Sequence, residues 1–286
     1  MDYPLYELSE KEFPGALCEI PDKPKMLYAR GTLPRERNKL LTVVGARTYT
    51  AYGEQVVEHL LGGLAGYPIS IISGLAIGID ALAHKAALRH SLHTLAVPGS
   101  GLSDSALYPR QNRKLAYEIL EAGGGLVSEF EPDFTPMEWA FPQRNRIMAG
   151  IANAVLVVEA QRKSGTLITA RLATDYNRDV LAVPGSIFSI KSEGTHLLIS
   201  LGATPVASAE EIIQALGLSP RENTSEDDTN LSPEEKALLA LLDSPRTHDE
   251  LIRGLARPAQ ETNALIMLME LHDRIRESGG LFVRGR

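Results

Sequence analysis

Residues 41–47 read Leu-Thr-Val-Val-Gly-Ala-Arg, an apolar run that stops abruptly in a loop of small residues. Four later segments repeat this pattern: Ile69–Leu75, Thr94–Gly101, Ala154–Glu159 and Val180–Ser186. Short β-branched runs without polar alternation are typical of strands that are buried on both faces, and therefore of a parallel sheet. All of these loops would leave the same edge of such a sheet. Because ligands bind outside the carboxyl ends of the strands, we expect the function at that edge.

Helical patterns lie between these strands, at Gly53–Leu64, Asp80–Arg89, Asn112–Glu121, Leu167–Tyr176 and Glu210–Leu216. The alternation predicts an α/β fold over residues 1–218: a Rossmann-like, doubly wound, mostly parallel sheet with right-handed crossovers. The first 40 residues are rich in proline and weakly periodic, so we expect them to extend the sheet at its edge by one or two strands.

The C-terminal part has a different organisation. Residues 219–230 are polar and charged and contain no apolar side chain, which predicts an acidic linker. A helix then begins at Ser232 as N-cap with Pro233 in its first turn. Two more helical stretches and two short strands around a Gly-Gly turn follow, which is the order of a winged helix over residues 231–286. Its third helix, up to Leu271, carries no Lys or Arg, so we expect little contact with a duplex.

The composition is that of an ordinary globular protein of 286 residues, with 44% hydrophobic residues. No apolar run approaches the length of about 18 residues that a membrane helix requires, and the N-terminus lacks a secretory pattern. Cys18 is the only cysteine, which excludes an internal disulfide and a cysteine zinc site. We therefore expect a cytoplasmic protein without membrane contact, metal or cofactor.

Net charge is −7, which argues against a uniformly basic surface. Phosphate contacts need only a few well-placed cations, however. Residues 141–174 carry five Arg and Lys side chains against Glu159 alone, and the predicted linker is acidic. The sequence thus indicates cations concentrated near the loops of the sheet edge.

Several of these loops combine small residues with cations, which is the composition of an anion site. Arg47 follows a glycine turn after a strand, and its forked guanidinium suits phosphate. The Pro-Gly-Ser-Gly turn at residues 98–101 leads to a helix start that contains Arg110, where backbone amides and the helix dipole favour anions. Arg144 and Arg146 flank Asn145, and the segment 163–166 joins a lysine, a glycine and hydroxyls. Any one loop has a structural alternative; four at one edge favour a phosphate-binding surface.

A second constellation, Asp80 and His84, lies four residues apart on one predicted helix face and could mimic a catalytic pair. We expect Asp80 to cap the helix and His84 to pack inside, because no serine or cysteine nucleophile is paired with them. No catalytic residue is predicted.

In order, these motifs resemble the DNA-processing protein A family (DprA, also called Smf), whose winged-helix module the C-terminal part also resembles. The resemblance covers about residues 25–217 and rests on the segments Val44–Arg47, Ser73–Asp80, Gly99–Leu102, Tyr108–Asn112, Ser128-Glu129, Phe141–Ile147 and Ser164–Thr169.

The resemblance implies a protein that binds single-stranded DNA without base specificity, protects it, and loads RecA recombinase onto it during natural transformation. It also implies a homodimer, with His196 and Ile199 near the interface. Carried over by motif, Arg47 and Arg110 would be the main phosphate contacts, and Leu102 would lie against a base. The full set of predicted nucleic-acid contacts is Arg47, Gly74, Gly99, Ser100, Gly101, Leu102, Arg110, Asn112, Arg144, Asn145, Arg146, Lys163, Ser164, Gly165 and Thr166.

Two departures from the family pattern and two rival functions stay open at this point. The loop between Leu102 and Tyr108 is longer than the family pattern, and an aliphatic side chain at residue 102 would stack less well than an aromatic one. The main rival function is that of a nucleotide-binding or phosphoribohydrolase-like protein. The hydrolase needs an acidic residue at the position where this chain has Ile168 or Thr169. A nucleotide sensor that signals through the winged helix is the other, while the incomplete glycine fingerprint disfavours a dehydrogenase.

Overall fold

The computed structural model describes residues 3–219, 232–242, 244–255, 257–271, 274–278 and 280–284. The chain divides into two compact units, Met1–Pro220 and Arg221–Arg286. The predicted linker, apart from Ser219, lies outside the described residues. Among those that are described, no helix is long and apolar enough to cross a membrane.

Unit 1 is built on a nine-stranded sheet in the order β1-β2-β6-β5-β4-β3-β7-β8-β9. The strands β1 and β2 pair antiparallel with each other, as do β2 and β6, and all other pairs are parallel. This confirms the predicted mostly parallel sheet, of which β1 and β2 form one edge. The strands are β1 (Leu5–Leu8), β2 (Leu27–Gly31), β3 (Lys39–Val44), β4 (Ile69–Ser73), β5 (His93–Ala96), β6 (Gly125–Ser128), β7 (Ala154–Val157), β8 (Asp179–Ala182) and β9 (Thr204–Pro205).

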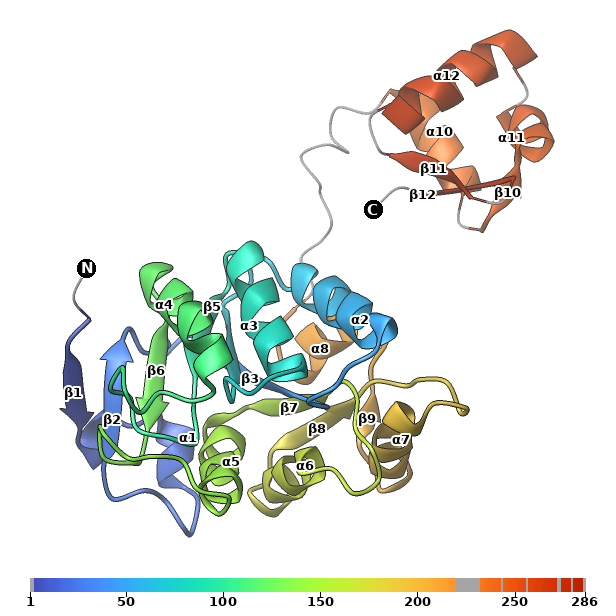
Figure 1. The fold of residues 1–286 in the computed structure, drawn as a ribbon. Helices are drawn as coiled ribbons and strands as arrows, with labels where there is room; N and C mark the ends of the chain where they lie inside the picture. The colour runs from blue at the N-terminus through green and yellow to red at the C-terminus, as the bar shows by residue number, and fades with distance from the viewer. Residues whose placement is uncertain are drawn as a thin grey trace. The chain divides into compact units, whose positions relative to one another are not determined.

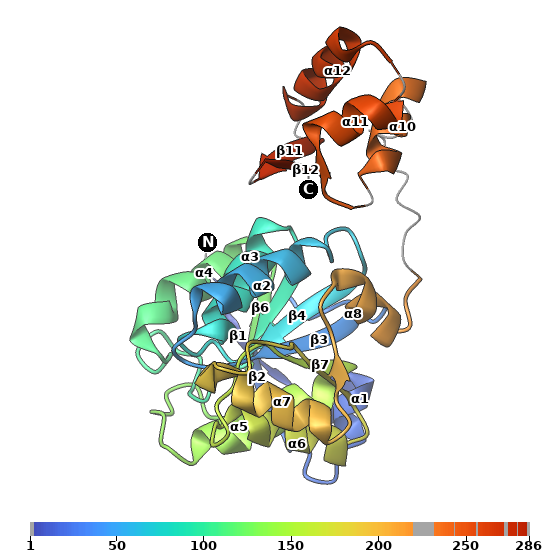
Figure 2. The ribbon, with the colours of Figure 1, turned by 90° about the vertical axis from the view of Figure 1, so that its right-hand side faces the viewer.

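Helices cover both faces of this sheet, with α2, α3, α4 and α8 on one side and α1, α5, α6 and α7 on the other (Figures 1 and 2). The α-helices are α1 (Gly15–Cys18), α2 (Ala51–Gly62), α3 (Ile79–Arg89), α4 (Arg113–Glu121), α5 (Ala140–Ile151), α6 (Thr166–Asp175), α7 (Glu193–Ser200) and α8 (Ala209–Ala215). The 3-10 helices of unit 1 are η1 (Glu10–Glu12), η2 (Arg110–Asn112) and η3 (Ile190–Ser192).

The strand β3 shows why the runs lack polar alternation. Its residues Leu41 and Val43 belong to the core cluster beneath α2, α3 and α8. Its residues Leu40 and Val44 belong to the cluster beneath α5 and α6. Because each face of the strand meets a helix layer, both sets of side chains must be apolar.

Helix α5 is the main element that the sequence did not predict. The segment Phe141–Ile147 is its first two turns rather than a loop, and Pro142 is tolerated because it lies in the first turn. The arginines of this segment therefore leave a rigid helix, which fixes where each can reach.

Unit 2 is a winged helix, as predicted. Helix α10 (Pro233–Leu241) begins with the expected cap, since the Ser232 hydroxyl accepts from the Glu235 amide at 3.2 Å. The other helices are α11 (His248–Leu255) and α12 (Ala259–Leu271), and the sheet order is β10-β12-β11, with β10 (Arg246–Thr247), β11 (Ile275–Ser278) and β12 (Leu281–Arg284). Leu238, Leu251 and Phe282 lie in its core.

Candidate nucleic-acid interface

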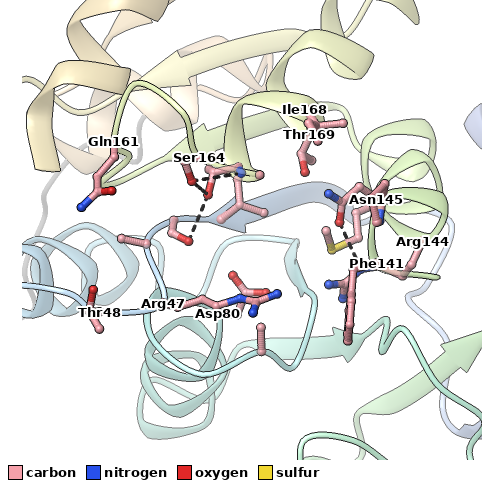
Figure 3. Close-up of a pocket in the computed structure, with 18 of the residues that line it drawn as sticks. Arg47, Thr48, Asp80, Phe141, Arg144, Asn145, Gln161, Ser164, Ile168 and Thr169 are labelled. Atoms are coloured by element: carbon pink, nitrogen blue, oxygen red, sulfur yellow. Dashed lines mark hydrogen bonds between the residues drawn. The ribbon is translucent and has the colours of Figure 1, made fainter. Parts of the chain in front are cut away.

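The sheet has one topological switch point, between β3 and β7. From β3 the chain winds through β4, β5 and β6 to one side, and from β7 it winds through β8 and β9 to the other. The two neighbouring strands therefore send their following helices to opposite faces, which opens a crevice at their carboxyl ends. A pocket of about 550 Å³ lies in this crevice (Figure 3).

Five segments of the chain line the pocket. Figure 3 shows Gln161 and Ser164 on one side, Phe141 and Asn145 opposite, and the β3–α2 loop with Arg47 between them. Side chains and backbone from the described residues make up its wall, among them Arg47, Thr48, Asp80, Phe141, Asn145, Gln161, Ser164, Gly165, Thr166 and Lys191.

Close packing of two loops sets the position of Arg47. The Ile79 amide donates to the Ala46 carbonyl at 3.1 Å, and a Cβ on Gly45 would lie 2.6 Å from the Ile79 side chain. Gly78 has φ +92°, a conformation that L side chains rarely adopt. Glycines at these two positions let the β3–α2 loop rest directly on the start of α3.

Arg47 is exposed, and its guanidinium carbon lies 5.6 Å from the centre of the Phe141 ring. This is a cation–π contact, and it leaves the charged edge of the guanidinium open to an anion. Within the described part of the chain no carboxylate forms an ion pair with Arg47. Arg47 does act electrostatically on the buried Asp80 carboxylate, where it opposes the rise in pKa that burial causes, so the pocket presents an aromatic ring, an exposed cation and a buried acid together.

Arg144, in contrast, is part of the protein interior at 5% exposed. Its Nη1 donates to the Gly74 carbonyl at 2.6 Å and also to the carbonyl of Val97, while the Gly74 amide donates to Asp80 at 3.1 Å. A Cβ on Gly74 would collide with the guanidinium. Arg144 therefore clamps the ends of β4 and β5 together while it also lines the pocket. A contact of Arg144 or Gly74 with DNA stays a prediction.

Burial shapes the electrostatics of this clamp. It lowers the pKa of Arg144 to about 10, an effect that Asp80 opposes, and it raises the pKa of Asp80, an effect that Arg144 opposes. Arg144 stays charged at neutral pH, so the floor of the pocket holds a compensated pair rather than a free cation.

The loop at residues 99–102 is closed. The Gly101 amide donates to the Phe134 carbonyl at 2.9 Å, and the Ser100 hydroxyl accepts from the Tyr108 amide at 3.1 Å. Leu102 is 0% exposed and packs in the core. The predicted phosphate cradle of Gly99, Ser100 and Gly101 and the base contact of Leu102 stay predictions, and all four residues are buried in this structure. The physical reason is that the segment 131–141 covers the loop, so close that a Cβ on Gly99 would lie 2.8 Å from the Phe141 ring.

Two further predicted contacts also bind other parts of the protein. Asn112 donates to the carbonyls of Leu75 (2.8 Å) and Ala76 (3.1 Å), which supports the loop after β4. Arg146 pairs with Glu129 and is only 12% exposed. The Ser-Glu motif and the second arginine of α5 are thus partners inside the protein, and a contact of Arg146 with DNA stays a prediction.

The remaining predicted contacts differ in exposure, and Thr166 is only 9% exposed. Arg110 is exposed at the start of η2, and Lys163 is exposed in the β7–α6 loop. Ser164, Gly165 and Thr166 line the pocket, where the Thr166 hydroxyl donates to the Gly45 carbonyl at 3.1 Å.

Sequence reasoning missed Phe141 and Lys191 as lining residues. Lys191 donates to the Thr48 hydroxyl at 2.6 Å and reaches the pocket from the loop after β8. Phe141 belonged to a recognised motif, but its role follows only from the helical geometry of α5. For Lys191 the signal was weaker: a lone lysine shortly after the fifth glycine turn.

The rival catalytic constellation is structural. His84 is fully buried, with Nδ1 2.7 Å from the Thr94 hydroxyl, which itself donates to the Ile71 carbonyl. Because the Thr94 hydroxyl donates its proton to the Ile71 carbonyl, it can only accept a hydrogen bond from His84. The Nδ1 of His84 therefore carries the proton and donates it to Thr94. Burial lowers the His84 pKa to about 3. No group of three or more His, Cys, Asp or Glu residues suited to a metal occurs in the described ranges.

The predicted dimer residues lie on α7. The His196 ring contacts the Gly185 carbonyl at 3.1 Å, and both His196 and Ile199 are partly buried. Their role in self-association stays a prediction.

Residues 5–217 match the family model for DNA recombination-mediator protein A, and residues 222–280 match that for the DprA winged helix domain. Protein Smf of Escherichia coli K12 is 44% identical over 204 residues, which are 71% of this chain and 54% of Smf. The X-ray structure of DNA processing protein A from Streptococcus pneumoniae superposes with a TM-score of 0.68 at 38% identity, over 74% of each chain. The Helicobacter pylori protein, whose structure addresses its single-stranded DNA binding mode, gives a TM-score of 0.65 at 30% identity, over 75% of this chain and 96% of that one.

Proposed function

Because the chain belongs to the DNA recombination-mediator protein A family, we propose that it binds single-stranded DNA at the carboxyl edge of its sheet. One observation carries the proposal: Arg47 is exposed and stacked on Phe141 in the pocket at the switch point. A nucleotide needs a cation for its phosphate and a flat apolar surface for its base, and this pair supplies both.

Further cations extend the site along the same edge. Arg110 lies at the helix start after β5, Lys163 follows β7, and Lys191 follows β8. A flexible polyanion could meet these cations in turn, whereas a stiff duplex is too wide to follow the loops. We infer selectivity for single strands without sequence preference, since stacking and phosphate contacts tolerate any base.

The same reasoning favours binding over catalysis. A phosphoribohydrolase would need an acid where this chain has Ile168 or Thr169, and Thr169 is itself 1% exposed. The carboxylate of the pocket floor, Asp80, is held by the Gly74 amide and compensated by Arg144.

The finer functional proposal rests on family membership. We propose that the protein protects incoming strands and passes them to RecA during natural transformation in the cytoplasm. It would act as a homodimer through the α7 region with His196 and Ile199. Helix α12, which has no Lys or Arg, would serve a protein contact rather than duplex reading.

The test is binding of the full chain to a labelled oligo(dT), to the matching duplex and to dTMP. We expect tight binding of the single strand, weak binding of the duplex and little competition by dTMP. RecA filament formation on the coated strand then tests the delivery step. Tighter binding of dTMP than of the oligonucleotide, or release of free base from it, would favour the nucleotide-binding rival.

A further inference from the structure

A second hollow, of about 460 Å³, lies beside the pocket at the switch point. Three loops contribute residues to both. The β3–α2 loop gives Thr48 to the first and Thr50 to the second, and the β8–α7 connection gives Lys191 to the first and Ser189 to the second. The loop after β7 likewise gives Gln161 to the first and Glu159 to the second. Residues two apart in a chain are at most about 7 Å from each other, so the hollows are neighbours.

The chemistry of the second hollow differs from that of the first. Glu159 is 2% exposed, and its carboxylate accepts from the Thr50 amide at 3.0 Å and the Thr50 hydroxyl at 2.5 Å. Thr50 is the N-cap of α2, and a Cβ on Gly53 would lie 2.5 Å from the same carboxylate. The protein's own acid therefore occupies the position where a helix start would bind an anion. The negative charge of Glu159 disfavours a phosphate group in this hollow, whereas an uncharged nucleic-acid base is not repelled.

One aromatic residue lines this hollow, and two exposed apolar side chains lie in the loop that borders it. The ring of Tyr52 lines it, and the Tyr52 hydroxyl donates to the Pro184 carbonyl at 2.6 Å. Between the lining residues Ser186 and Ser189, the loop exposes Ile187 (80%) and Phe188 (92%). Such exposure of large apolar side chains in one loop indicates a contact surface.

We propose that this hollow and Phe188 receive a second base of the same DNA strand, with Lys191 between the two bases holding the phosphate. The inference rests on the proposed function and deepens it. Two observations favour this occupant: three loops line both hollows, and Lys191, which lines the first, lies in the chain between Ser189 and Ser192, which line the second.

The test uses the full chain with Phe188→Ala, a change at a solvent-exposed side chain, and oligo(dT) probes that carry one abasic position each. For the unmodified strand we expect Phe188→Ala to weaken binding between about 5-fold and about 150-fold, the range of one stacked base. At one abasic position the wild type should lose a similar factor and the variant should lose none. The matched control is Met26→Ala, an exposed apolar side chain that precedes β2, six strands away from β8; it should bind like the wild type.

A direct optical readout is also accessible, because Trp139 is the only tryptophan. In a Trp139→Phe chain, Phe188→Trp should show fluorescence quenching when oligo(dT) is added. Equal binding by Phe188→Ala and wild type, or a tryptophan signal that DNA leaves unchanged, would overturn the second base site. So would a change in sedimentation of Phe188→Ala without DNA, since the loop would then be a face for a second copy. If Arg47→Ala loses binding and Phe188→Ala binds like the wild type, the proposed function is supported and the second base site is not.

Discussion

The loops after β3 and after β5 begin alike in sequence, each as an apolar strand that ends in a glycine turn, yet they have opposite roles in the structure. After β3, Arg47 remains exposed on the Phe141 ring at the edge of a pocket. After β5, residues 99–102 are buried, and the Gly101 amide is hydrogen-bonded to Phe134. A glycine turn therefore permits close approach without deciding what approaches: a ligand in one loop, the protein's own chain in the other.

The largest expected effect concerns Arg144, which clamps the ends of β4 and β5 together. Arg144→Met should destabilise the protein by about 3–5 kcal/mol, because it leaves Asp80 uncompensated and two carbonyls without a donor. Urea unfolding of unit 1 checks this. A change below about 1 kcal/mol would show that the guanidinium is not structural.

Leu102→Ala tests the closed loop itself. We expect a loss of about 2–5 kcal/mol in unfolding free energy, the cost of a cavity at a fully buried leucine. Affinity for a single strand, measured where the variant is folded, should stay close to that of the wild type. An unchanged stability with weakened binding would instead place Leu102 on the DNA.

Phe141→Leu tests the open region. Loss of the ring should weaken oligo(dT) binding by about 1–3 kcal/mol, because an aliphatic side chain stacks poorly on a base. Fluorescence anisotropy gives the affinity, and thermal melting serves as the control for folding. If a folded Phe141→Leu variant bound oligo(dT) with wild-type affinity, the Phe141 ring would not be part of the binding site.

The buried His84 adds a pH dependence to the closed region. Its folded pKa, about 3, lies below the unfolded value of 6.5, so the unfolded state takes up the proton first as pH falls. The stability that this group contributes is present above pH 6.5 and is lost towards pH 3, by up to about 1.4 kcal/mol per pH unit. His84→Gln should show a shallower loss of stability between pH 6.5 and 4.5. Equal slopes would mean that the ring is not buried in its neutral form.

Much of this architecture was predictable because it depends on local pattern. The strands could be assigned since side chains such as Leu40 and Leu41 face two different helix layers, and the exposed Arg47 follows its strand directly. The burial of Leu102 was not predictable, because the segment that covers it begins about thirty residues later in the chain. Arg144 and Arg146 look equivalent in sequence, but on helix α5 one points to Gly74 and the other to Glu129. Long-range packing decides such assignments, and it also brought Lys191 to the pocket.

The most direct test of the account is the salt dependence of single-strand binding by Arg47→Ala. The matched control, Arg37→Ala, removes the same charge from an exposed position that precedes β3, at the opposite edge of the sheet. We predict that Arg47→Ala binds oligo(dT) more weakly, that its plot of log K against log salt concentration is shallower by about 0.7, and that Arg37→Ala matches the wild type. The same affinity and slope for Arg47→Ala and wild type would contradict the assignment of the β3–β7 crevice as the DNA site.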